Sequence, residues 1–156
     1  MAKLKTKIQV QTQKFDVGSE YEELRSFSLS AGAVVTFSGT VRDLNEDKTV
    51  RSLYLEHYPK MTERALCSIA TDASQRWDLI ALTIIHRVGK FTPGDEIVFV
   101  GIASQHRESA FASCAFVMDY LKTRATFWKK EKTGKGERWL TTRASDLIAD
   151  ASWDKQ

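Results

Sequence analysis

The sequence predicts an α+β fold in one domain, and three observations support this. Segments with the alternation of β-strands outnumber segments with helical periodicity, and the two kinds follow one another in mixed order. At 156 residues and 17.7 kDa the chain has the size of a single domain. No internal repeat, low-complexity tract or linker divides it. We therefore expect one domain over residues 1–156, in which helices pack against a sheet.

The first forty residues predict two strands separated by a short helix. Residues 6–11 alternate between polar and apolar side chains, as in a strand with one buried face. Residues 19–28 predict a helix with Ser19 as its N-cap, because Glu22 follows three residues later. Residues 31–41 are rich in β-branched side chains and form the strongest strand signal in the chain.

A polar segment, residues 43–49, is predicted to be a mobile surface loop before the next strand. Residues 50–58 alternate again and predict a long strand. Pro59 favours the start of a helix that extends to Trp77, with apolar side chains on one face.

The second half of the chain predicts a strand pair, a long helix and a hairpin. Strands are expected at residues 80–88 and 96–103, joined through a Thr-Pro-Gly-Asp turn. A helix is expected at residues 104–124. Residues 127–132 and 138–142 predict a hairpin around two glycines.

Composition and motifs exclude several classes of protein. A net charge of only +3 does not indicate a dedicated nucleic-acid binder, and no apolar run approaches the roughly 20 residues of a membrane span. We expect a cytoplasmic protein, since no secretory signal is evident. Cys67 and Cys114 are far apart and outside any metal-ligand spacing. Nucleotide-cofactor, zinc-protease and serine-hydrolase motifs are also missing, so we expect no cofactor and no metal.

Positive charge is concentrated late in the chain, which predicts a local anion site rather than a basic coat. Eight basic residues lie between positions 122 and 143: Lys122, Arg124, Lys129, Lys130, Lys132, Lys135, Arg138 and Arg143.

Lys122 falls on the helical stripe of Phe111, Ala115 and Met118, which we expect to be the buried side. Removing an ammonium from water is costly unless it is paired or its pKa falls. Two interpretations remain open. Either the stem packs and the ammonium reaches solvent at the helix end, or Lys122 lines a pocket for an anionic or electrophilic ligand.

Two further segments are candidates for anion binding. Arg42 ends a strand just after Gly39, where a missing side chain would allow a ligand to approach the backbone. His106 and Arg107 begin a helix, where two cations oppose the helix dipole unless an anion lies there. For both segments, solvated side chains are the simpler alternative. The pair formed by His86 and Arg87 is interpreted as structural.

Six segments together closely resemble one known family. They are FSGTVR at 37–42, LEHYPKMTE at 55–63, IIHRVG at 84–89, PGDEIVFVG at 93–101, HR at 106–107 and MDYLKTRATFWKKE at 118–131. In this order, and over nearly the whole chain, they resemble the catalytic (large) subunit of molybdopterin synthase. The resemblance implies an α/β hammerhead-type fold and a homodimer, with a small ubiquitin-like sulfur-carrier subunit at each end of a heterotetramer. It also implies a sulfurtransferase of molybdenum cofactor biosynthesis, which carries two sulfurs from the carrier's C-terminal thiocarboxylate to cyclic pyranopterin monophosphate and forms the dithiolene of molybdopterin.

The resemblance also implies roles for individual residues. Lys122 and Lys129 match the catalytic lysines, with Lys122 as a proton-transfer group or amine of lowered pKa and Lys129 as a stabiliser of developing negative charge. Arg143 resembles an arginine contributed across the dimer interface. The implied substrate-binding set is Thr40, Val41, Arg42, His106, Arg107, Lys122, Lys129, Lys130, Glu131 and Arg143.

One departure from the family concerns Thr126, where the family usually has proline, so we expect a looser turn before Trp128 and Lys129. The alternative to the enzyme is a small basic module that binds nucleic acid or another anion without catalysis. Such a module would need a basic face with exposed aromatic side chains. The enzyme requires cations that converge in one concave site.

Overall fold

The fold combines two β-sheets with four α-helices in the computed structural model, which describes residues 3–45, 48–140 and 143–155. The first sheet has the order β1 (Lys5–Gln11), β5 (Ala81–Arg87), β7 (Glu96–Ser104) and β2 (Ala33–Thr40). The second sheet has the order β3 (Leu44–Asn45), β4 (Lys48–His57), β8 (Phe127–Thr133) and β9 (Gly136–Trp139), and β6 (Gly89–Phe91) also pairs with β4. The helices are α1 (Val17–Ser26), α2 (Met61–Arg76), α3 (Arg107–Thr123) and α4 (Ala144–Ser152), followed by a 3-10 turn at Trp153–Lys155. This arrangement confirms the predicted α+β class.

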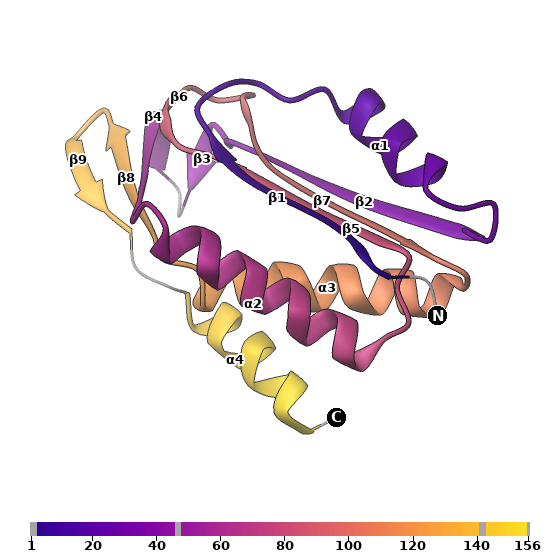
Figure 1. The fold of residues 1–156 in the computed structure, drawn as a ribbon. Helices are drawn as coiled ribbons and strands as arrows, with labels where there is room; N and C mark the ends of the chain where they lie inside the picture. The colour runs from indigo at the N-terminus through magenta and orange to yellow at the C-terminus, as the bar shows by residue number, and fades with distance from the viewer. Residues whose placement is uncertain (1–2, 46–47, 141–142, 156) are drawn as a thin grey trace.

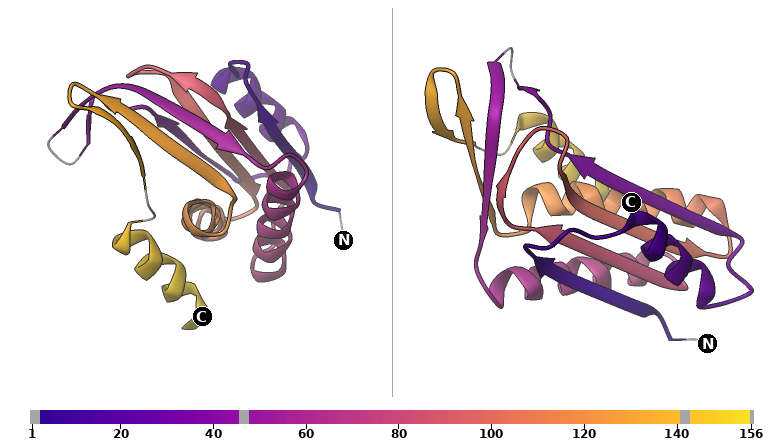
Figure 2. Two further views of the ribbon diagram at one scale, coloured as in Figure 1. Left: turned by 90° about the vertical axis from the view of Figure 1, so that its left-hand side faces the viewer. Right: turned by 90° about the horizontal axis from the view of Figure 1, so that it is seen from above.

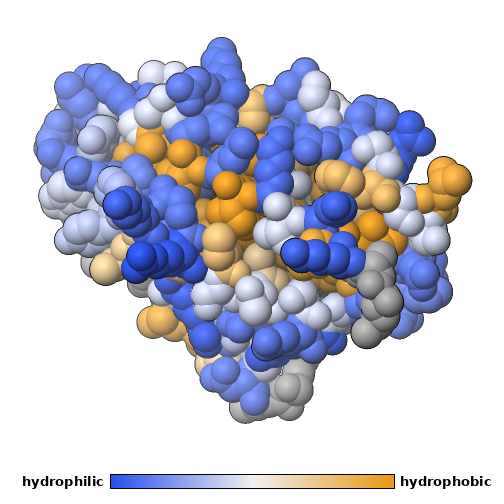
Figure 3. Space-filling model, in the orientation of Figure 1, coloured by the Kyte–Doolittle hydropathy of each residue, from blue (hydrophilic) through white to orange (hydrophobic). Residues whose placement is uncertain are grey.

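The first sheet is covered on both faces, with α1 on one side and α2 and α3 on the other (Figures 1 and 2). Every residue of β5 is buried. Along β5 and β7, Ile85 and Phe99 pack toward α1, whereas Ile84 and Val100 pack toward α2 and α3. In Figure 3, apolar patches form a band across the middle of the visible face, over the strands between α1 and α2.

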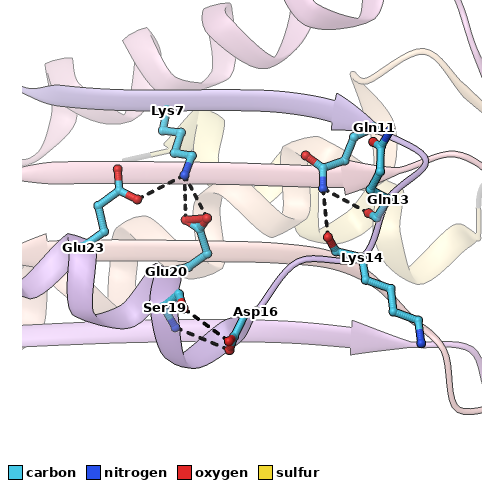
Figure 4. Close-up of polar contacts among 8 residues, drawn as sticks. All are labelled: Lys7, Gln11, Gln13, Lys14, Asp16, Ser19, Glu20 and Glu23. Atoms are coloured by element: carbon cyan, nitrogen blue, oxygen red, sulfur yellow. Dashed lines mark hydrogen bonds and ion pairs between the residues drawn. The ribbon is translucent and has the colours of Figure 1, made fainter.

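Helix α1 is anchored to this sheet by packing and by charge. Leu24 is fully buried, and Gly101 of β7 leaves room for it, because a Cβ at that position would lie 2.3 Å from Leu24 Cδ1. From β1, the Lys7 ammonium donates to Glu20 at 2.8 Å and to Glu23 at 3.1 Å (Figure 4). Burial opposes the charge of Lys7, but these two carboxylates outweigh it and raise the pKa of the ammonium.

The predicted N-cap of α1 was wrong by three residues. Asp16 is the N-cap, and its Oδ1 accepts from the backbone N–H of Gly18 at 3.0 Å. The Ser19 hydroxyl instead donates to Asp16 Oδ2 at 3.2 Å. An aspartate cap satisfies the same unpaired N–H groups that a serine cap would.

Other predicted elements need smaller corrections. The predicted loop at 43–49 contains β3, which pairs with β4 and forms a hairpin, while residues 46–47 lie outside the described residues. Strand β6 and helix α4 were not predicted. Trp153, just after α4, packs edge-on against Trp77 and Phe116.

None of the helices in the described part of the chain is long and apolar enough to cross a membrane.

Candidate functional site

A cavity of about 520 Å³ lies where the two hairpins β3–β4 and β8–β9 meet the end of α3 and the start of α4. Its volume is in the range of small-molecule sites. The cavity is lined by Thr40, Val41, Arg42, Asn45, Val50, Leu53, Ile97, Lys122, Phe127, Lys129, Glu131, Arg138, Trp139, Leu140, Arg143, Ser145 and Asp146. Cations converge here from four separate segments, as the enzyme interpretation requires.

Lys129 is the desolvated cation of the cavity. Burial lowers the pKa of its ammonium to about 8, and the nearby charges of Lys122 and Arg143 contribute in the same direction, while Asp146 opposes them. An amine with a pKa near 8 is partly neutral at physiological pH. Lys129 can therefore accept a proton or act as a nucleophile, which an ordinary surface lysine rarely does.

A hydrogen-bonded cluster occupies another part of the cavity wall. Asn45 Nδ2 donates to Glu131 Oε2 at 3.0 Å, and the Asn45 Oδ1 accepts from Arg143 Nη2 at 2.5 Å. Arg138 donates to Glu131 Oε1 through Nε at 3.1 Å and through Nη2 at 2.8 Å. Glu131 is buried, so this two-point contact holds a carboxylate away from solvent.

Phe127 lines the cavity, and its ring packs against the imidazole of His86. The two rings are stacked, with centroids 3.9 Å apart. Burial lowers the pKa of His86 to about 3, and the charges of Lys129 and Lys122 add to this effect. The imidazole is therefore neutral, and its Nδ1 donates to the carbonyl of Arg87 at 2.9 Å. This contact supports the structural interpretation of His86.

Seven of the predicted site residues line the cavity together. They are Thr40, Val41, Arg42, Lys122, Lys129, Glu131 and Arg143. The remaining three, His106, Arg107 and Lys130, do not.

The expectation that Lys122 shares the buried side of its helix was wrong. Lys122, Ala115 and Phe111 are all exposed, and the buried face of α3 includes Cys114 and Val117 instead. Because apolar residues occupy both sides of this helix, the periodicity alone did not identify the buried one. Lys122 still lines the cavity, but the desolvation and the lowered pKa fall on Lys129.

Lys130 points away from the cavity because successive side chains of a strand face opposite sides. On β8, Phe127, Lys129 and Glu131 face the cavity. Lys130 instead pairs with Glu137 at 2.7 Å and lies over the Trp139 ring. Trp128 also lies outside the cavity lining and packs edge-on against Tyr58, with centroids 4.3 Å apart.

His106 and Arg107 lie at the opposite end of α3 from Lys122. Seventeen helical residues span about 25 Å, so one chain cannot bring both ends to one small-molecule site. Both side chains are exposed, and Glu108 supplies a negative charge in the first turn of the helix.

Arg143 reaches the cavity from its own chain, through its bond to Asn45. Its expected contribution across a dimer interface stays a prediction.

Sequence reasoning missed Asn45, Asp146 and the specific role of Arg138. Arg138 was visible only as one member of the basic segment. Asn45 lay in a segment predicted to be a loop, and Asp146 lies on the unpredicted helix α4. The alternation of β8 was the signal that could have excluded Lys130.

Two expectations about backbone geometry also change. At Gly39, an added Cβ would lie 2.6 Å from Val98 Cγ1, so the space is taken by the protein rather than left for a ligand. Thr126, where the family usually has proline, is held by Thr62 of α2, whose hydroxyl donates to the Thr126 carbonyl at 3.0 Å. The two hydroxyls also lie 2.8 Å apart. The turn before Lys129 is therefore anchored rather than loose.

Replacing Thr62 by valine should lower the free energy of unfolding by about 1–3 kcal/mol, since it removes the partner of partly buried backbone groups at Tyr58 and Thr126. Thr71→Val, on an exposed face of the same helix, is the matched control and should change stability by less than about 0.5 kcal/mol. Urea unfolding of the two variants measures the difference. Equal effects would show that the Thr62 contact does not anchor the turn.

Comparisons with known proteins match this chain to one family. The family described as MoaE protein matches residues 10–124. The molybdopterin synthase catalytic subunit of Pseudomonas aeruginosa is 53% identical over 148 residues, which are 95% of this chain and 99% of the relative. The catalytic subunit of Escherichia coli K12 is 54% identical over 148 residues, covering 95% of this chain and 98% of that one. The structure of a molybdopterin biosynthesis MoaE protein from Burkholderia ambifaria is similar with a TM-score of 0.82 and 50% identity, over 99% of both chains.

Proposed function

Since this chain belongs to the MoaE protein family, we propose that it is the catalytic subunit of a molybdopterin synthase. As such it transfers sulfur from the C-terminal thiocarboxylate of a small carrier subunit to cyclic pyranopterin monophosphate, and two transfers form the dithiolene of molybdopterin. The protein acts in the cytoplasm as a sulfurtransferase of molybdenum cofactor biosynthesis.

The observation that carries the proposal is the convergence of cations in one cavity. Arg42, Arg138, Arg143, Lys122 and Lys129 all line it. The substrate carries a phosphate ester, and the carrier leaves as a carboxylate, so both reactants present anions to the site. Preorganised cations stabilise negative charge that develops during the reaction, more strongly in a partly enclosed site than in water.

The structure supports an exchange of the roles expected for the two lysines. Lys129, with its lowered pKa, is the group that can hold or accept a proton, or approach the acyl carbon of the carrier as a neutral amine. Lys122, at the exposed end of α3, supplies positive charge beside it.

No cysteine of this chain is needed for the chemistry, because the carrier delivers the sulfur. In each transfer the thiocarboxylate sulfur forms a carbon–sulfur bond to the pterin side chain, where a carbon–oxygen bond breaks. Water then hydrolyses the acyl carbon–sulfur bond of the carrier, and the carrier leaves as a carboxylate. Cys114 is unsuited to a nucleophilic role, since burial raises the pKa of its thiol to about 11.

A homodimer would bring His106 and Arg107 to a cavity, although they are remote from the cavity of their own chain. Phe111, which is 63% exposed, lies one turn after Arg107 on the same side of α3. Strand β2, at an edge of the first sheet, also exposes Phe37. An interface that covers these apolar groups places Arg107 within it. In a symmetric dimer each subunit then supplies His106 and Arg107 to the cavity of the other.

The direct test is product formation. The purified chain, incubated with thiocarboxylated carrier and cyclic pyranopterin monophosphate, should form the dithiolene, detected by mass spectrometry as the gain of two sulfurs. The same carrier ending in an ordinary carboxylate is the control and should give no product. If no dithiolene forms and RNA binds with steep salt dependence instead, the alternative of a basic binding module replaces the enzyme.

A further inference from the structure

We infer that Asn45, the only asparagine of the chain, is a positioning residue that sets the direction and net charge of the arginine cluster in the cavity. The inference rests on the proposed function for the identity of the anion, a phosphate ester. It assigns a role to a residue that contacts no catalytic lysine in the described network.

Asn45 connects segments that are distant in sequence. Although it is close to a hairpin end, only 8% of its surface is exposed. Its side chain bonds Glu131 of β8 and Arg143 before α4, and its Oδ1 lies 3.5 Å from Arg42 Nη2. Its backbone carbonyl lies 3.5 Å from Arg138 Nη2. One residue thus contacts three arginines and the carboxylate between them.

An amide suits this position because it can donate and accept at the same time. The oxygen faces the guanidinium groups of Arg42 and Arg143, whereas the NH₂ group faces Glu131. The flipped amide would place N–H groups against guanidinium groups and an oxygen against a carboxylate, so the neighbours determine the orientation. A guanidinium has five N–H donors in a rigid fork, and one bond to Asn45 therefore fixes its direction and leaves donors for an anion.

The neutrality of Asn45 matters as much as its hydrogen bonds. Three guanidinium groups against the single carboxylate of Glu131 leave two net positive charges in the cluster. An aspartate at position 45 would remove one of them and would place a second carboxylate about 3 Å from the first, where like charges repel. Asn45→Asp therefore keeps the shape of the side chain and changes only its charge and donors.

The experiment measures binding of inorganic phosphate by calorimetry and, with the carrier present, KM and kcat for the cyclic pterin. Asn45→Asp should weaken phosphate binding at least about tenfold and raise KM in parallel, with kcat changed less than about threefold. The double variant Asn45→Asp/Glu131→Gln exchanges the amide and the carboxylate, and it should recover affinity to within about threefold of the wild type. Leu44→Asp adds the same charge at the exposed neighbouring residue and should change affinity less than about threefold.

Asn45→Ala removes the side-chain bonds without adding charge, so it covers the case in which Asn45→Asp does not fold. Its phosphate affinity should fall by about three- to tenfold. The inference is overturned if Asn45→Ala binds phosphate like the wild type, if the exchange variant binds no better than Asn45→Asp, or if kcat falls while KM and phosphate affinity stay constant.

The two measurements, phosphate binding and dithiolene formation, separate this inference from the proposed function. Absence of dithiolene product with the expected order of phosphate affinities would reject the function and support Asn45. Normal product formation with phosphate affinities that do not depend on residue 45 would support the function and reject the role of Asn45.

Discussion

Lys129→Met should reduce turnover at least about 10²-fold, the usual scale for a positioned proton-transfer group. Methionine retains most of the length and the apolar stem of lysine but cannot carry a proton. The rate of dithiolene formation under single-turnover conditions measures the loss, because it excludes effects on product release.

The same substitution should stabilise the folded chain near pH 7. The pKa of Lys129 is lowered from 10.5 to about 8 on folding. Below pH 8 its ammonium is charged in both states, and this charge destabilises the folded chain because it is better solvated in the unfolded chain. Removing it should raise the free energy of unfolding on the order of 2 kcal/mol at pH 7. Between pH 8 and 10.5 Lys129 has lost its proton in the folded chain but keeps it in the unfolded chain. The free energy of unfolding of the wild type therefore rises with pH in this range, and its difference from that of Lys129→Met becomes smaller.

Lys130→Met is the matched control, since Lys130 is the adjacent residue on the opposite face of β8 and pairs with Glu137. Its turnover should change less than about threefold, and its stability by less than about 1 kcal/mol. If Lys130→Met loses as much turnover as Lys129→Met, the assignment of the two faces of β8 is wrong. If Lys129→Met retains turnover, the proton-transfer role of Lys129 is excluded.

Mixing two inactive chains should restore activity if the subunits share sites. Lys129→Ala disables the cavity of its own chain, and Arg107→Ala removes a group that we propose acts in the partner's cavity. In a mixed dimer, one of the two cavities then has both an intact Lys129 and an Arg107 from the other subunit. Random mixing makes about half of the dimers heterodimers, each with one working site, so about a quarter of wild-type activity should return.

The control mixes Lys129→Ala with Lys122→Ala. Lys122 and Lys129 line the same cavity of one chain, so each cavity of that heterodimer lacks one of the two lysines. No activity should return. Activity in this control mixture, or no activity in the Arg107→Ala mixture, would contradict a site shared in the proposed way. Neither result would contradict the roles proposed for Lys122 and Lys129 within one cavity.

The long strands and the long helices were predictable because their signals are local. Buried strands such as β5 and β7 are rich in apolar residues, and the alternation of β4 is visible in the sequence. The ends of α1 and α3 were shifted by one to three residues, a common uncertainty when several polar residues can cap a helix. Helix α4 was missed, because its exposed face carries Leu147 and Ile148 and none of its residues is buried.

The sequence by itself determined the fold class, the family and the residue types that carry the chemistry. The motif at 37–42 contains Arg42, and the motif at 118–131 contains Lys122 and Lys129. Only the tertiary structure decided which lysine is desolvated, because burial depends on the segments that pack around each side chain. It also placed Lys130 outside the cavity, His106 and Arg107 about 23 Å along α3 from Lys122, and Arg143 beside Asn45. These are contacts between residues far apart in the chain, and local periodicity carries no information about them.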